Sequence, residues 1–162
     1  MGTVFRSESG IGTFHEFTLF TGVITISGNA FRGSSIQEIT FPGSVTTVED
    51  SAFNGCASLK TLNINEGCQT FKSQWIWGCI PLELLVFPST TIDITGYGLI
   101  AYRASYDVIC KAVTPPSLGS SSYNQVIKSI FVPDSSVDSY KAASVWSNLS
   151  SKIKPLSEYS EE

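Results

Sequence analysis

One sequence pattern recurs through the middle of this chain and constrains its fold more than any other feature. The best-preserved copy spans Ile36–Cys56 and the next spans Leu59–Cys79, so equivalent residues lie 23 positions apart. Each copy has three apolar residues in the order apolar-x-x-apolar-x-apolar, then a Pro or Asn, a second apolar pair, and a bulky residue followed by Gly and Cys. A fixed period of about 20 to 50 residues is typical of solenoids, in which each repeat packs on its neighbours.

The pattern extends in both directions with offsets of 22 or 23 residues. The first copy begins at Phe14, the last ends at Pro133, and the fifth is reduced to Val108-x-Cys110. We therefore predict about six repeats in a solenoid over residues 14–133. The flanking segments are predicted to be an N-terminal tail or partial cap (1–13), a helical C-terminal cap (134–156) and a polar tail (157–162).

Each repeat predicts one short β-strand with a single buried face. In Ile39-x-Phe41 the two apolar side chains point to the same side, because successive side chains of a strand alternate. Pro42 ends the strand since it has no N–H to donate. Val45-x-x-Val48 then returns the chain over the core, and Ala52-Phe53-x-Gly55 adds a bulky core side chain in a bend or helical turn. The sequence thus predicts short parallel strands with irregular or helical returns.

Two segments depart from this pattern. Gly96–Ser122 is rich in Gly, Ser and Pro, and Thr114–Ser122 in particular predicts a long surface loop. After Pro133, apolar residues follow at helical spacing, less regularly toward the end: Val137, Tyr140, Val145, Trp146, Leu149 and Ile153. We expect a capping helix there, because the edge of the last strand would otherwise be open to pairing with other chains.

Composition excludes several classes of protein. With 42% hydrophobic and 15% charged residues, the chain is not intrinsically disordered. The net charge of -4 and the scattered Lys and Arg give no electrostatic basis for binding nucleic acid. No apolar run reaches the roughly 18–20 residues of a transmembrane helix. Met1–Thr3 shows no signal-peptide pattern, so we expect either a cytosolic protein or one whose signal has been removed.

No catalytic or metal-binding motif is present in the sequence, and we expect no enzymatic activity, cofactor or metal. His15, the single histidine, is predicted to be an exposed structural side chain, with a catalytic base as the alternative. Glu49-Asp50 is predicted to be a solvated pair, with a calcium contact as the alternative. Cys56 and Cys79 occupy equivalent positions, so we expect buried free thiols, with a disulfide between them as the alternative.

The residues between the inward positions define a candidate partner-binding surface. Repeat spacing places two lines of side chains on the outer side of the sheet: Thr18, Thr40, Asn63, Val86, Ile109 and Phe131, and beside them Glu16, Glu38, Thr61, Leu84, Asp107 and Ser129. The surface changes from polar to apolar, so Leu84, Val86, Ile109 and Phe131 predict a contiguous exposed apolar patch. The alternative is that the C-terminal segment or the Pro-rich loop folds over it. Covered or not, the patch is our candidate surface for partners.

Aromatic side chains offer a second candidate site. Trp75 occupies a core position of its repeat, but Trp77 lies beside it, and Tyr97 and Tyr102 follow about one repeat later. Rings of this kind present an apolar face with a polar edge. Trp77, Tyr97 and Tyr102 are therefore candidates for stacking on a glycan, with core or interface packing as the alternative.

Ala52-Phe53-x-Gly55-Cys56-x-x-Leu59-x-x-Leu62-x-Ile64 resembles the BspA-like class of bacterial leucine-rich repeats. The segment Ile130–Lys141, with Trp146 and Ile153, resembles the end that commonly closes such proteins in gut Bacteroidetes. The resemblance covers about residues 14–156, although Trp75-Ile76 stands where Ala-Phe is usual.

This resemblance implies a right-handed, leucine-rich-repeat-like solenoid and a function without catalysis. The chain would be a protein-binding or adhesion module, either secreted or on the outer membrane or cell surface, with an unknown host or bacterial protein as partner. The alternatives are a glycan-binding module and a structural spacer within a larger surface protein.

Overall fold

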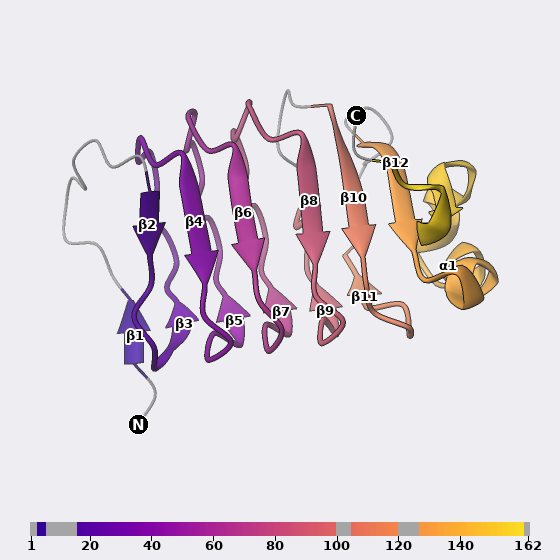
Figure 1. The fold of residues 1–162 in the computed structure, drawn as a ribbon, viewed down its shortest axis with the longest axis horizontal. Helices are drawn as coiled ribbons and strands as arrows, with labels where there is room; N and C mark the ends of the chain where they lie inside the picture. Colours follow the sequence, from indigo (N-terminus) through magenta and orange to yellow (C-terminus); the bar gives the residue numbers. More distant parts are fainter. Residues whose placement is uncertain (1–2, 6–15, 100–104, 120–126, 161–162) are drawn as a thin grey trace.

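The computed structural model describes residues 3–5, 16–99, 105–119 and 127–160, with side chains from residue 19 onward. Every strand pairing in it is parallel, and the strands stack along one long axis with helical turns gathered at the C-terminal end (Figure 1). His15 and Tyr102 lie outside the described residues.

The longer strands form one wall of the stack, which we call the front face (Figure 1). It comprises a three-stranded sheet, β2 (Glu16–Thr18), β4 (Glu38–Phe41) and β6 (Thr61–Ile64), and a four-stranded sheet, β8 (Leu84–Phe87), β10 (Tyr106–Cys110), β12 (Ile127–Val132) and β13 (Ile153–Pro155). Ile39 pairs with Leu62 and Leu85 with Val108, which is the register that the repeat spacing predicts.

Short strands form the opposite wall, a six-stranded back sheet. Its members are β1 (Thr3–Phe5), β3 (Val23–Ile26), β5 (Thr47–Val48), β7 (Thr70–Phe71), β9 (Asp93–Ile94) and β11 (Ser117–Leu118). The prediction of irregular or helical returns was wrong here. The second apolar pair of each repeat is a strand, because its buried residue pairs with its equivalent in the next repeat: Val48 with Phe71, Phe71 with Ile94, and Ile94 with Leu118.

Two of these strands lie outside the returns that the repeat pattern predicted. β1 lies in the segment predicted to be a tail or partial cap, and it pairs with β3. β11 lies in Thr114–Ser122, which the sequence predicted to be a surface loop. Both strands extend the back sheet beyond the repeats that the pattern marks clearly.

The core lies between the two walls and is built from equivalent positions of successive repeats. Ile39 and Phe41 are fully buried, as predicted. The bulky residues that follow the back strands lie in turns, not helices, and stack on one another: the rings of Phe31 and Phe53 are 4.9 Å apart between centroids. Trp75 is the next in this series, and its indole N–H donates to the Gly98 carbonyl at 2.7 Å. The one polar group of this larger side chain is therefore hydrogen-bonded to the following repeat.

The four cysteines are buried free thiols, so the Cys56–Cys79 disulfide alternative is not realised. Each of these two thiols donates to a carbonyl of a preceding repeat: Cys56 Sγ to Phe31 O at 2.9 Å, and Cys79 Sγ to Phe53 O at 3.3 Å. Burial raises the pKa of Cys68 to about 12 and also raises that of Cys110. At neutral pH these two thiols are protonated core side chains without nucleophilic character.

The C-terminal segment contains several short elements instead of one helix. In order these are η2 (Asp134–Ser136), α1 (Val137–Ala142), η3 (Trp146–Lys152), β13 and η4 (Leu156–Glu158). Val145, with φ of 66°, lies in the left-handed region between α1 and η3. The predicted helical stripe through Ile153 was therefore wrong, because the chain turns at Val145 and Ile153 pairs with Ile130 of β12.

Two aromatic side chains of this segment bind the fifth repeat. The Tyr140 hydroxyl donates to the Ala112 carbonyl at 2.8 Å, and the Trp146 indole N–H donates to the Pro116 carbonyl at 2.7 Å. The two rings are fully buried and contact one another, with 5.0 Å between centroids. Backbone carbonyls beside β11, the last strand of the back sheet, are thus paired by side chains of the C-terminal segment.

Acidic side chains connect neighbouring repeats through backbone N–H groups. Asp50 accepts from the Ser73 N–H at 2.8 Å, and Glu49 accepts from the Gly28 N–H at 3.0 Å. These hydrogen bonds to Glu49 and Asp50, which the sequence predicted to be a solvated pair, therefore connect three repeats. Within the described residues, no cluster of three or more His, Cys, Asp or Glu side chains occurs that could hold a metal ion.

Candidate partner-binding surface

The outward side chains of the front face follow the predicted lines. Thr40 pairs with Thr18 and Asn63, and Ile109 pairs with Val86 and Phe131. In the first half of the face, the Asn63 amide donates to the Glu38 carboxylate at 2.8 Å and to the Thr40 hydroxyl at 3.3 Å. These polar side chains bind one another across repeats, and the apolar side chains begin at β8.

The predicted apolar patch is only partly exposed. Leu84 and Val86 are half-buried, whereas Ile109 and Phe131 are each 7% exposed. The expectation of a contiguous exposed patch was therefore wrong for Ile109 and Phe131. At Phe131 the alternative holds, because the ring of Tyr159 packs edge-on against it with 5.0 Å between centroids. Lys154 Nζ lies 5.8 Å from the centroid of the same Phe131 ring.

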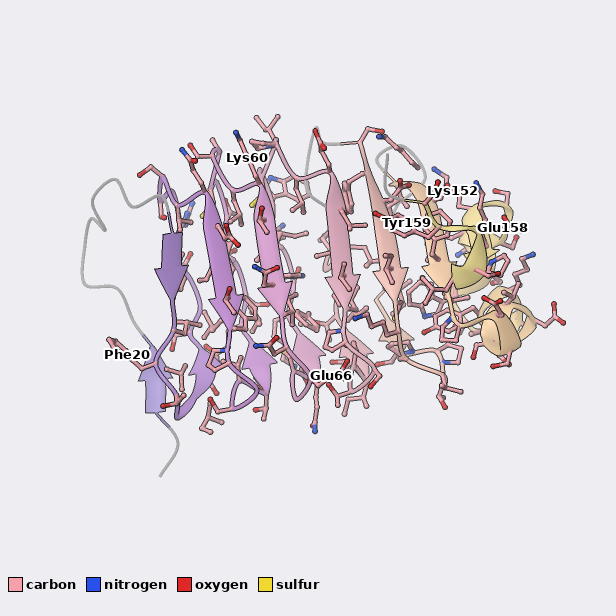
Figure 2. The ribbon with its side chains drawn as sticks, viewed as in Figure 1. Phe20, Lys60, Glu66, Lys152, Glu158 and Tyr159 are labelled. Carbon is pink, nitrogen blue, oxygen red and sulfur yellow. The ribbon has the colours of Figure 1, made fainter. Side chains whose placement is uncertain are left out.

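The segment that carries Tyr159, residues 156–160, is named here the C-terminal strap. The sequence predicted a polar tail from residue 157, whereas η4 and Tyr159 of the strap lie against the front face (Figure 2). The Ser157 N–H donates to the Asp134 carboxylate at 3.0 Å. This hydrogen bond and a second one from the Ser157 side chain lower the pKa of Asp134. The strap is thus tied at one end and packed by its aromatic ring at the other.

A hollow of about 430 Å³ lies between the strap and the front face. Leu84, Phe131 and Tyr159 give it apolar walls. Charged side chains also line it, with acidic Glu83 and Asp107 on the β8 and β10 side and basic Lys128 and Lys154 from β12 and β13. Glu158 of the strap adds a carboxylate on the lysine side, so the lining combines charges of both signs with the apolar side chains of Leu84, Phe131 and Tyr159.

The aromatic candidates are partly brought together. Trp77 and Tyr97 lie in turns of successive repeats, with 6.1 Å between ring centroids and an interplanar angle of 79°. Trp77 is half-buried and packs against the core, whereas Tyr97 is 44% exposed. Tyr97 is thus the more accessible ring of this pair.

A second hollow, also about 430 Å³, was not predicted from the sequence. Its lining includes Ile92 and Val113, which are exposed, and also Thr91. The repeat alignment gives no clear signal for it. Ile92 stands where the two preceding repeats have Gln69 and Thr46, but the first repeat also has an aliphatic residue at this position, Ile24.

A family model of the BspA-type leucine-rich repeat region matches residues 9–105 in six copies. The chain belongs to the BspA-type leucine-rich repeat family. No match was found among curated proteins.

BspA-type repeats are scaffolds that generally mediate protein interactions. In this member the stacking continues past the matched residues, because β10 and β12 pair in parallel with their neighbours beyond residue 105. No helix within the described residues is long and apolar enough to cross a membrane. The hollow under the strap lies at the junction between the matched BspA-type repeats and the C-terminal elements.

Proposed function

We propose that this BspA-type chain is a non-enzymatic protein-binding or adhesion module of a secreted or cell-surface protein. Its binding surface is the front face over β8, β10 and β12. The observation that carries this proposal is the half-buried pair Leu84 and Val86 beside a hollow with charges of both signs. Protein interfaces have this composition, with an apolar centre and a polar rim.

The partner is a protein, on the host or on another bacterium. The polar half of the front face does not provide a comparable anchor, because Asn63, Glu38 and Thr40 already bind one another. A partner that covers Leu84 and Val86 removes apolar surface from water, which is the main source of affinity at such interfaces.

The experiment compares two charged substitutions at half-buried outward positions. Val86→Asp places a carboxylate in the proposed surface, and Thr47→Asp does the same on the back sheet. Binding to a panel of purified extracellular-matrix proteins is measured by biolayer interferometry. We expect Val86→Asp to weaken binding at least about tenfold, which is ~1.4 kcal/mol. Thr47→Asp should leave it unchanged, and equal binding by both variants would contradict the proposal.

A glycan-binding module is the second candidate, supported by the contact between Trp77 and the exposed Tyr97. Titration with oligosaccharides should quench tryptophan fluorescence if a sugar ring covers this pair, and Tyr97→Ala should abolish the change. Without any quenching this candidate fails. A structural spacer, the third reading, would bind neither proteins nor glycans through these surfaces.

A further inference from the structure

The C-terminal strap occupies the surface that the proposed function assigns to a partner. Its Tyr159 ring covers Phe131, which would otherwise continue the apolar line from Val86 and Ile109. Glu158 lines the same hollow as Lys128 and Lys154. The chain thus places an acidic and an aromatic side chain, adjacent in sequence, into a hollow with an apolar wall and two lysines.

We propose that the strap is an internal stand-in for a partner segment, and that the hollow binds a short acidic–aromatic stretch of another protein. In that complex the partner's aromatic side chain takes the place of Tyr159 on Phe131, and its carboxylate takes the place of Glu158 near Lys128 and Lys154. This inference rests on the proposed function of the front face and adds the kind of sequence that it recognises.

The charge and shape of the hollow favour this partner chemistry. The two lysines come from the strands nearest the strap and are exposed, so an acidic residue that reaches the hollow from that side meets positive charge. On the opposite side Glu83 is exposed and favours a basic residue further along the partner segment. An acidic–aromatic–basic order along the stack matches the lining in both sign and position.

Two kinds of contact attach the strap to the rest of the chain. Ser157 binds the Asp134 carboxylate through its N–H and its side chain, and the Tyr159 ring packs against Phe131. An external segment can repeat the aromatic contact and also extend over Leu84 and Val86, which are only half-buried in the presence of the strap. This additional apolar contact gives the partner the differential affinity that displacement requires.

The test uses the full chain and a synthetic peptide that copies residues 155–160, labelled with a fluorophore. Fluorescence anisotropy measures its binding to the wild-type chain, to Tyr159→Ala and to Tyr159→Phe. In the Tyr159→Ala variant the hollow has lost its internal ring, so we expect it to bind the peptide at least tenfold tighter than the wild type. Tyr159→Phe keeps the ring and should behave like the wild type. A peptide with Ala in place of Tyr should not bind.

Equal binding to the wild type and Tyr159→Ala, or no binding to either, would overturn the proposal. Dimerisation of Tyr159→Ala that buries the hollow would assign it to a second copy of the chain and would also overturn it. A second measurement uses the wild-type chain and so does not depend on the folding of the variant. In the wild-type chain, the Ser157 amide should exchange with deuterium while the amides of β12 remain protected. Exchange of Ser157 only together with β12 would show that the strap does not open on its own.

These outcomes separate the inference from the proposed function. Val86 does not line the hollow, so Val86→Asp should still permit peptide binding in the Tyr159→Ala background. If the peptide binds but no protein of the panel does, the inference stands and the proposed function is unsupported. If a protein of the panel binds in a way that depends on Val86 but the peptide does not bind, the proposed function stands and the inference fails.

Discussion

At the scale of single residues, successive repeats approach each other closely at stacked glycines. Gly67 has φ of +117°, and a Cβ added there would lie 2.2 Å from the Gly43 carbonyl oxygen. That oxygen is backbone and cannot move without displacing its own repeat. The position therefore requires glycine for two independent reasons, its backbone conformation and the lack of space.

Gly67→Ala should lower the free energy of unfolding by more than the cost of the backbone conformation alone, which is of order 1–3 kcal/mol. The matched control is Gly22→Ala, where φ is +98° but, apart from the glycine and its chain neighbours, no atom of the described residues lies within 4 Å of the added Cβ. Urea unfolding followed by circular dichroism measures both. Equal losses of stability in the two variants would contradict the predicted clash.

Thr91 is a polar residue at a core position. Its hydroxyl is buried and has no hydrogen-bond partner among the described residues, and the two preceding repeats have Cys68 and Val45 at this position. Thr91→Val should therefore stabilise the chain by about 1–3 kcal/mol, since it removes an unsatisfied buried group. Thr90 is the control, because its hydroxyl donates to the Cys68 carbonyl and accepts from the Gly67 N–H.

In thermal or urea unfolding, Thr91→Val should raise stability while Thr90→Val lowers it. A loss of stability in Thr91→Val would mean that its hydroxyl has a partner in solution, such as an ordered water in the adjoining hollow.

At the scale of elements, predictability differed between the two walls. The front strands were predictable because two signals agree in Ile39-x-Phe41: the alternation within a strand and the spacing between repeats. The back strands are only two residues long in β5, β7, β9 and β11, too short to show alternation. Their strand character comes from pairing with equivalent residues of neighbouring repeats. A local sequence pattern therefore could not distinguish them from irregular returns.

The links between elements should make stability depend on pH. Partial burial opposes ionisation of Glu66, but hydrogen bonds from the Ser89 hydroxyl and N–H outweigh it and lower the Glu66 pKa below its ordinary 4.5. The folded state therefore binds this proton less readily than the unfolded chain. The resulting stability is complete above pH 4.5 and is lost as the pH falls through the lower, folded-state value.

Glu66→Ala should reduce stability near pH 7 and have a smaller effect near pH 3, because the contribution of the carboxylate decreases as the pH falls below 4.5 toward its lower, folded-state pKa. Since Glu66 is exposed, the difference should be at most about 1 kcal/mol. Urea unfolding at both pH values measures it, and Ser89→Ala, which removes the hydroxyl donor, should show part of the effect. A loss of stability in Glu66→Ala that is the same at both pH values would contradict the predicted contribution of the ionised Glu66 carboxylate.

The C-terminal elements depend on hydrogen bonds from two aromatic side chains. Trp146→Phe keeps most of the ring but leaves the Pro116 carbonyl without its donor, so we expect a loss of about 1–3 kcal/mol. Tyr140→Phe leaves the Ala112 carbonyl in the same situation and should give a similar loss. Thermal unfolding by circular dichroism measures both variants. Unchanged melting temperatures would show that these donors do not fasten the end of the stack.

At the scale of the whole molecule, the sequence predicted the outward lines of side chains correctly but not their exposure. The lines follow from strand register, which repeats every 22 or 23 residues. The covering of Phe131 by Tyr159 joins β12 to the strap, and no periodic feature connects these two parts. Tyr159 is a single aromatic residue in a polar stretch, so composition alone indicated a solvated tail.

The central claim is that partners bind the front face over β8, β10 and β12. Hydrogen–deuterium exchange of the full chain, with and without a protein captured from the binding panel, tests this claim most directly. We predict that the bound protein slows exchange in β8, β10 and β12, leaves β5 and β7 unchanged, and speeds exchange in the strap as Tyr159 is displaced. Slower exchange confined to the back sheet, with the strap unaffected, would contradict the account.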